Sequence, residues 1–195
     1  LELINSHKVE MLSLHARTVK GGYKSEVQYE YIQEAAKIVN CPVLANGNIT
    51  SFKSSEKVLK ETQCRGVMIG RSCIRNPWIF RQIEEYLTGK PIFSPTFKDV
   101  RGYIDDLYQL SDESNQEERF RINYLKKFLN FIGISIDSEG QFLYQARRCK
   151  SKAELDTICD HYLINEGNSE KIYPLEPTAG LVARPNCEIK NTCYL

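Results

Sequence analysis

The chain has 195 residues, of which 42% are apolar, and its formal net charge is +1. This length allows one domain or two small ones with a real core, and the balanced total charge excludes a strongly basic nucleic-acid-binding protein while permitting a local basic surface. Seven cysteines without a CxxC pair indicate buried thiols in a reducing cytoplasm, and no apolar run approaches the length of a membrane span. The first residue, Leu1, suggests that the sequence begins inside a longer protein.

The first 88 residues alternate between short apolar runs and segments of helical length. Three apolar runs are too short for helices and rich enough in Val and Ile to be strands of a buried parallel sheet, namely residues 9–15, 42–45 and 66–69. Three further segments are predicted as helices, namely residues 27–39, 51–62 and 77–87. This alternation predicts an α/β fold.

Glycine-containing turns follow the second and third predicted strands, at Asn46-Gly47-Asn48 and at Gly70-Arg71. In (β/α)8 barrels the loops after the last two strands commonly bind a phosphate through backbone N–H groups. Glycine allows the main chain to approach a phosphate closely, and Arg71 would add a fixed positive charge. From spacing alone, a phosphate site and ordinary turns both remain open.

The predicted domain organisation has three parts. An eight-fold barrel needs about 250 residues, so residues 1–90 are expected to be the C-terminal portion of a TIM barrel. Residues 91–166 are predicted to form a small helical bundle, and residues 167–195 an extended tail that lies along it or is disordered. The four helices of the bundle are expected at residues 96–110, 116–131, 139–149 and 151–163.

A third segment, His15-Ala16-Arg17-Thr18, ends the first predicted strand. With the two glycine turns it resembles the tRNA-dihydrouridine synthase family. The resemblance is strong from Leu12 to Phe80, where Asn76-Pro77-Trp78-Ile79-Phe80 is its most discriminating part, and it continues more weakly to about residue 165. Ala16 stands where glycine is commoner in the family, and Asn48 where aspartate is commoner.

The resemblance implies a flavoenzyme that reduces uridine in tRNA to 5,6-dihydrouridine, with FMN as cofactor and NADPH or NADH as electron donor. Arg17 would lie behind the cofactor or on the substrate side. The catalytic cysteine is expected upstream of Leu1, so this chain alone is expected to be inactive. The implied FMN contacts are His15, Asn46, Gly47, Asn48, Gly70 and Arg71.

Cys41 precedes a proline, as the family's catalytic cysteine does, yet it lies where a predicted strand begins. Because barrel chemistry takes place at the opposite ends of the strands, Cys41 is interpreted as a structural thiol.

Basic residues concentrate in the segment 119–152, where eight Lys and Arg face only two acidic residues, a local net charge of +6. Such charges are often a solvated helix face, but the resemblance implies a tRNA-binding role for this region. Tyr124 and Tyr144 are interpreted as core residues. The strongest candidates for phosphate contacts are Arg147, Arg148, Lys150 and Lys152.

Two alternatives remain beside the synthase. One is another FMN-dependent barrel oxidoreductase, similar to dihydroorotate dehydrogenase, against which the helical region and Asn76-Pro77-Trp78 argue. The other is a non-catalytic RNA-binding module. The expected partner is tRNA in the cytoplasm, with no membrane and no metal.

Overall fold

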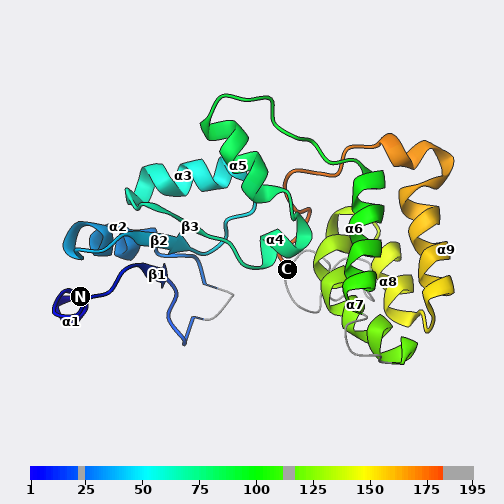
Figure 1. Cartoon of the computed structure of the whole chain (residues 1–195), viewed down its shortest axis with the longest axis horizontal. Helices are drawn as coiled ribbons and strands as arrows, with labels where there is room; N and C mark the ends of the chain where they lie inside the picture. The colour runs from blue at the N-terminus through cyan, green and yellow to red at the C-terminus, as the bar shows by residue number, and fades with distance from the viewer. Residues whose placement is uncertain (22–24, 112–116, 182–195) are drawn as a thin grey trace.

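The computed structural model describes residues 1–21, 25–111 and 117–181. The elements form two groups that follow one another along the long axis (Figure 1). The first, here called the sheet part, contains α1 (Glu2–Asn5), β1 (Leu12–His15), α2 (Tyr29–Ile38), β2 (Val43–Asn46), α3 (Phe52–Thr62), β3 (Gly66–Met68), α4 (Arg71–Arg75) and α5 (Ile79–Leu87). The second, the helical part, contains α6 (Phe97–Leu110), α7 (Glu118–Ile132), η2 (Gly133–Ser135), α8 (Gln141–Arg148), α9 (Lys152–Leu163) and η3 (Asn165–Glu170).

The strands form one parallel sheet in the order β1-β2-β3, which confirms the predicted α/β pattern. His15 of β1 is paired with Asn46 of β2, and Asn46 with Met68 of β3. The carboxyl ends of all three strands therefore lie at one edge of the sheet. This small parallel sheet is consistent with part of a barrel.

The helices begin where the sequence supplies capping side chains. The Ser51 hydroxyl accepts a hydrogen bond from the Ser54 N–H at the start of α3, and Thr96 with Asp99 forms a reciprocal capping box at the start of α6. The predicted helix 77–87 begins only at Ile79, and the short helix α4 precedes it unpredicted. Asn76 is extended because it precedes a proline, and this separates α4 from α5.

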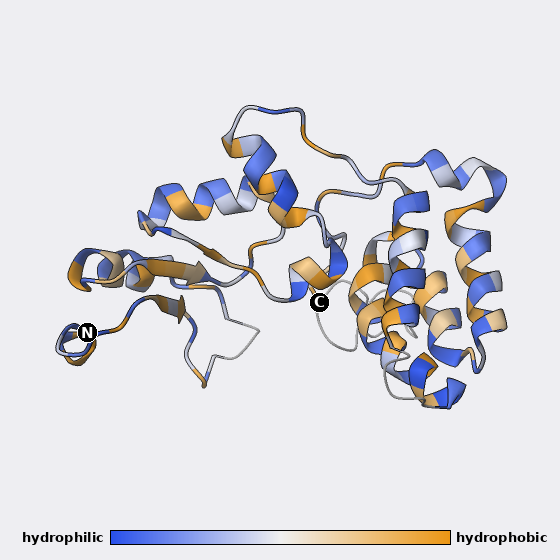
Figure 2. Cartoon of the chain, viewed as in Figure 1, coloured by the Kyte–Doolittle hydropathy of each residue, from blue (hydrophilic) through white to orange (hydrophobic). Residues whose placement is uncertain are grey.

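Each part has its own apolar cluster. In the sheet part, Ile32, Val43, Ala45 and Val58 are buried together with Ile79 of α5. Figure 2 shows that apolar residues also line the inner sides of α6 to α9, where the four helices share one core close to the ranges predicted for them. The most buried side chains of this second cluster include Val100, Ile122, Leu125, Leu129, Phe142, Leu155 and Leu163.

Residues 171–181, here called the C-terminal strap, return from η3 and pack between the two parts. Tyr173 is only 1% exposed, and its hydroxyl donates to the Ile132 carbonyl over 2.6 Å. In this structure the stretch packs against the helical part. Residues 182–195 lie outside the described residues.

Arg75, at the end of α4, anchors the C-terminal strap although it is itself only 1% exposed. Its guanidinium donates to the Ser135 hydroxyl and to the carbonyls of Leu175 and Glu176, at 3.0–3.1 Å, and also to the Pro174 carbonyl. Burial lowers the pKa of Arg75. One buried side chain thus ties the sheet part, the helical part and the C-terminal strap together.

Candidate functional site

A cleft of about 500 Å³ opens at the carboxyl ends of the three strands. The predicted cofactor residues, which come from three separate segments, meet in it, and so does Arg17. Sequence reasoning missed the opposite wall, which the C-terminal strap supplies through Pro177, Ala179, Gly180 and Leu181. The lining residues that were predicted are His15, Arg17, Asn46, Gly47, Asn48, Gly70 and Arg71.

The two glycines predicted for the cleft, Gly47 and Gly70, allow the main chain to approach a ligand for different reasons. Gly47 has a φ of +132°, and a Cβ there would lie 2.8 Å from Val27 Cγ2, so this position requires glycine. A Cβ on Gly70 would meet nothing within 4 Å, because that position faces open space. Asn48 has a φ of 49°, a left-handed conformation that asparagine tolerates.

Short hydrogen bonds hold the Asn46-Gly47-Asn48 loop in place. The Tyr29 hydroxyl donates to the Gly47 carbonyl over 2.7 Å, and burial raises the pKa of Tyr29, so it stays a donor at neutral pH. His15 Nδ1 lies 3.1 Å from the Asn46 carbonyl oxygen. Asn46 Nδ2 donates to the Met68 carbonyl over 2.8 Å, so this amide nitrogen joins β2 to β3.

Two arginines give the cleft its positive charge. Arg71 Nη1 donates to the Leu181 carbonyl of the C-terminal strap. Arg17 Nε donates to the Ser25 carbonyl over 2.8 Å, whereas its buried Nη1 has no hydrogen-bond partner among the described residues. A buried N–H donor without an acceptor is costly. Open main chain, the glycine turns and the charge of Arg71 together form a set of groups that suits an anion such as a phosphate.

A second pocket, here called the basic pocket, has a volume of about 490 Å³ and lies between α7 and α8. Arg148 and Lys150 line this pocket, and both are among the residues predicted from the sequence to contact phosphates. Arg119 and Lys126 also line it but are not among those residues. Arg119 and Lys126, with Asn123 between them, are spaced along α7 so that they lie on one helix face. This spacing is visible in the sequence and could have identified them. The lining residues are Arg119, Asn123, Lys126, Arg148, Cys149 and Lys150.

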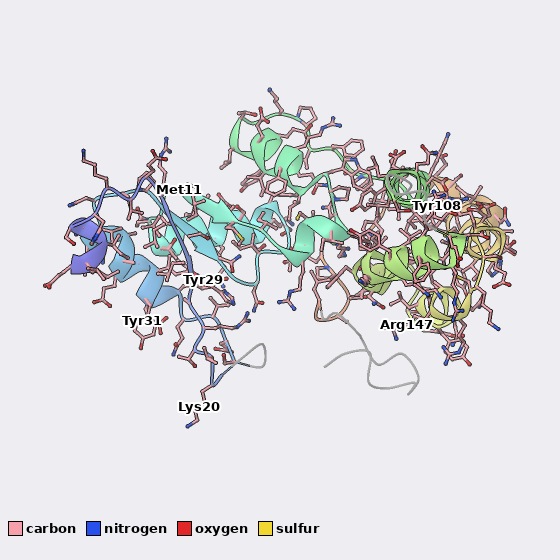
Figure 3. All side chains as sticks on the ribbon, turned by 60° about the horizontal axis from the view of Figure 1, so that its bottom comes forward. Met11, Lys20, Tyr29, Tyr31, Tyr108 and Arg147 are labelled. Atoms are coloured by element: carbon pink, nitrogen blue, oxygen red, sulfur yellow. The ribbon has the colours of Figure 1, made fainter. Side chains whose placement is uncertain are left out.

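The other two basic candidates lie elsewhere. Nε and Nη2 of Arg147, labelled in Figure 3, both donate to Asn130 Oδ1, at 3.0 and 2.9 Å. Lys152 pairs with Asp105 and Asp156, the same carboxylates that Arg101 binds. The four candidates therefore do not form one surface.

Cys41 lies two residues before β2, at the end of the strand opposite Asn46, as its interpretation as a structural thiol requires. Of the five described cysteines only Cys149 and Cys159 are buried, fewer than expected.

The part of the chain that the structure describes contains no cluster of His, Cys, Asp or Glu suited to a metal ion. None of its helices is long and apolar enough to cross a membrane.

Comparison with known proteins agrees with the resemblance. The chain is 27% identical over 151 residues to the tRNA-dihydrouridine(16) synthase of Neisseria meningitidis serogroup A, covering 77% of this chain and 45% of that protein. It is 35% identical over 85 residues to a probable tRNA-dihydrouridine synthase of Aquifex aeolicus, covering 44% and 27%. It is 40% identical over 93 residues to tRNA-dihydrouridine synthase B of Pseudomonas putida, covering 47% and 28%.

The chain thus spans less than half the length of each of these relatives. The family model described as dihydrouridine synthase matches residues 2–165, which include the whole sheet part and α6 to α9. Because this match covers most of the sequence, the chain belongs to the dihydrouridine synthase family.

Proposed function

We propose that this chain is the C-terminal part of an FMN-dependent enzyme that reduces uridine to 5,6-dihydrouridine in tRNA. The observation that carries the proposal is the cleft at the strand ends, where residues from three distant segments meet around open main chain and two arginines. Family membership and the names of the relatives support the reaction class. In this proposal, residues 1–90 belong to the cofactor-binding barrel, residues 91–166 bind tRNA, and residues 167–195 are a tail.

The residues of the cleft fit the phosphate end of FMN. Bound FMN would supply to the uracil ring a hydride taken from NADPH or NADH, and the proton that completes the reduction would come from the catalytic cysteine expected upstream of Leu1. Gly47 and Gly70 leave the main chain open to phosphate oxygens, and Arg71 supplies a positive charge. His15 and Asn46 keep the strand ends in register through their own hydrogen bonds.

The C-terminal strap contributes to this site without neutralising it. The Leu181 carbonyl accepts a hydrogen bond from Arg71, and a neutral carbonyl leaves the guanidinium charge unchanged. The Glu176 carboxylate accepts hydrogen bonds from the Thr50 and Ser51 hydroxyls at the start of α3. The Glu176 carboxylate therefore occupies the N-terminal end of α3. A bound phosphate would instead contact Gly70, Arg71 and the Gly47 loop.

The test is the complete gene product that contains this chain, purified and examined first for flavin absorption and then for dihydrouridine formed in unmodified tRNA. We expect a flavin band and NADPH- or NADH-dependent modification, while residues 1–195 alone retain no FMN and remain inactive. Bound flavin with unmodified tRNA would favour another FMN-dependent oxidoreductase.

A non-catalytic RNA-binding module is the second candidate, because the basic pocket lies in the helical part and needs no flavin. A complete protein that binds tRNA but contains no flavin would favour it.

A further inference from the structure

Two tyrosines of the helical part lie on the surface, which corrects their interpretation as core residues. Tyr144 is 38% exposed and Tyr124 is 50% exposed. On α8 the buried stripe consists of Phe142, Leu143 and Ala146, so Tyr144 points away from the core. A singly exposed aromatic side chain is ordinary in itself, so the significance of Tyr144 depends on the groups around it.

Arg148 lies directly on the face of Tyr144. The guanidinium carbon is 3.6 Å from the ring centroid, and Arg148 Nη1 donates to the Tyr144 carbonyl over 3.0 Å. Such a cation–π stack fixes a long, otherwise variable side chain in one orientation. It leaves a flat aromatic and guanidinium surface at the protein–solvent boundary.

The stack separates two adjacent hollows that share Arg148 and Cys149. One is the basic pocket, which no carboxylate lines among the described residues. The other has a volume of about 420 Å³ and includes Tyr144, Thr157 and Ile158 in its lining. Its one carboxylate, Glu154, accepts a hydrogen bond from the Lys150 backbone N–H over 2.7 Å. A cationic hollow therefore adjoins a hollow with an aromatic and aliphatic lining.

We propose that the two hollows form one nucleotide subsite, with a backbone phosphate in the basic pocket and the unpaired base of the same strand against Tyr144. The assignment rests on the proposed function, because it takes RNA as the partner. Phosphates pair with Lys and Arg irrespective of sequence, and an unpaired base stacks on an aromatic ring or a guanidinium plane. An acidic protein segment would use the cations but would gain nothing from the aromatic face.

The experiment measures the binding of the complete gene product that contains this chain to two probes of equal length, a single-stranded oligouridylate and a blunt RNA duplex, over a range of salt concentrations. The variants are Tyr144→Ala, Tyr144→Leu and Tyr144→Phe, with an Arg148→Ala/Lys150→Ala double variant for the phosphate contacts. Tyr31→Ala is the matched control, because Tyr31 is 54% exposed on α2 in the sheet part (Figure 3). Thermal melting establishes that each variant is folded.

For the single strand, we expect Tyr144→Ala and Tyr144→Leu to raise Kd by roughly 5-fold to 150-fold without changing the salt slope. Tyr144→Phe and Tyr31→Ala should bind like the wild type, and Tyr144→Ala should leave duplex binding unchanged. The double variant should instead lower the salt slope by about two, about one for each lost phosphate contact.

Single-strand binding that survives Tyr144→Ala and Tyr144→Leu while the double variant weakens it would overturn the stacking subsite and leave the proposed function standing. A wild-type chain that binds neither RNA would overturn both the subsite and the tRNA-binding role of the helical part. Equal losses on single strand and duplex would also contradict stacking, since a paired base has no exposed face to offer.

Discussion

The predicted site residues lie close together in the sheet part, whereas those of the helical part do not. In the sheet part, residues as far apart in sequence as His15 and Arg71 line one cleft. In the helical part, the adjacent residues Arg147 and Arg148 separate, one bound to Asn130 and the other lining the basic pocket. Parallel strands end at one edge of a sheet whatever lies between them, whereas neighbouring positions on a helix point about 100° apart. Residues at the ends of parallel strands therefore lie together because of the sheet topology, whereas consecutive basic residues on a helix point in different directions.

The largest expected effect concerns the junction of the two parts. Arg75→Leu leaves the Ser135 hydroxyl and the strap carbonyls without their donor, so we expect the free energy of unfolding to fall by about 3 kcal/mol or more. Arg81→Leu is the control, because Arg81 is exposed and its contacts with Glu85 and the Phe93 ring are surface contacts, each worth less than about 1 kcal/mol. Denaturant unfolding of both variants measures the difference. Equal losses would mean that Arg75 does not join the parts.

Glycine substitutions test the contrast between loop and helix. Gly47→Ala forces a side chain into a positive φ and against Val27, so we expect a loss of about 1–3 kcal/mol in unfolding free energy. Gly102→Ala, in the interior of α6 where a Cβ meets nothing within 4 Å, should stabilise the chain by about 0.5–1 kcal/mol. Effects of the same sign would contradict the loop geometry around Gly47.

Because Arg147 does not share a surface with Arg148 and Lys150, we expect these residues to contribute unequally to tRNA binding. Arg148→Ala with Lys150→Ala should lower the salt slope of tRNA binding by about two, because both residues line the basic pocket. Arg147→Ala should leave the slope unchanged, because Asn130 holds its guanidinium outside that pocket. Binding titrations at several salt concentrations measure both slopes, and a loss of slope in Arg147→Ala would restore the continuous surface expected from sequence.

Apolar runs and turn residues were enough to predict the strands, most of the helices and the two glycine turns of the cleft. His15 and Arg17 were assigned only through the family resemblance, and no sequence pattern indicated the wall that the C-terminal strap supplies. Helix α4 was missed because five largely polar residues carry no helical periodicity, and only Asn76-Pro77 marks its end. The docking of the C-terminal strap depends on Arg75, whose buried position no local pattern reveals. The prediction that Tyr124 and Tyr144 are core residues was wrong because it rested on residue type alone. Their exposure follows from their helical phase relative to the buried Leu125 and Leu143.

We propose that the cleft at the strand ends binds the phosphate of FMN and that the opposite ends of the strands carry no chemistry. The most direct measurement is the flavin-to-protein ratio of the complete protein carrying either Arg71→Ala or Cys41→Ala. We expect Arg71→Ala to weaken flavin binding by about 1.5–3 kcal/mol, the worth of a charge-assisted phosphate contact, and Cys41→Ala to retain both flavin and turnover. Undiminished flavin in Arg71→Ala, or loss of uridine reduction in Cys41→Ala with flavin still bound, would contradict the account.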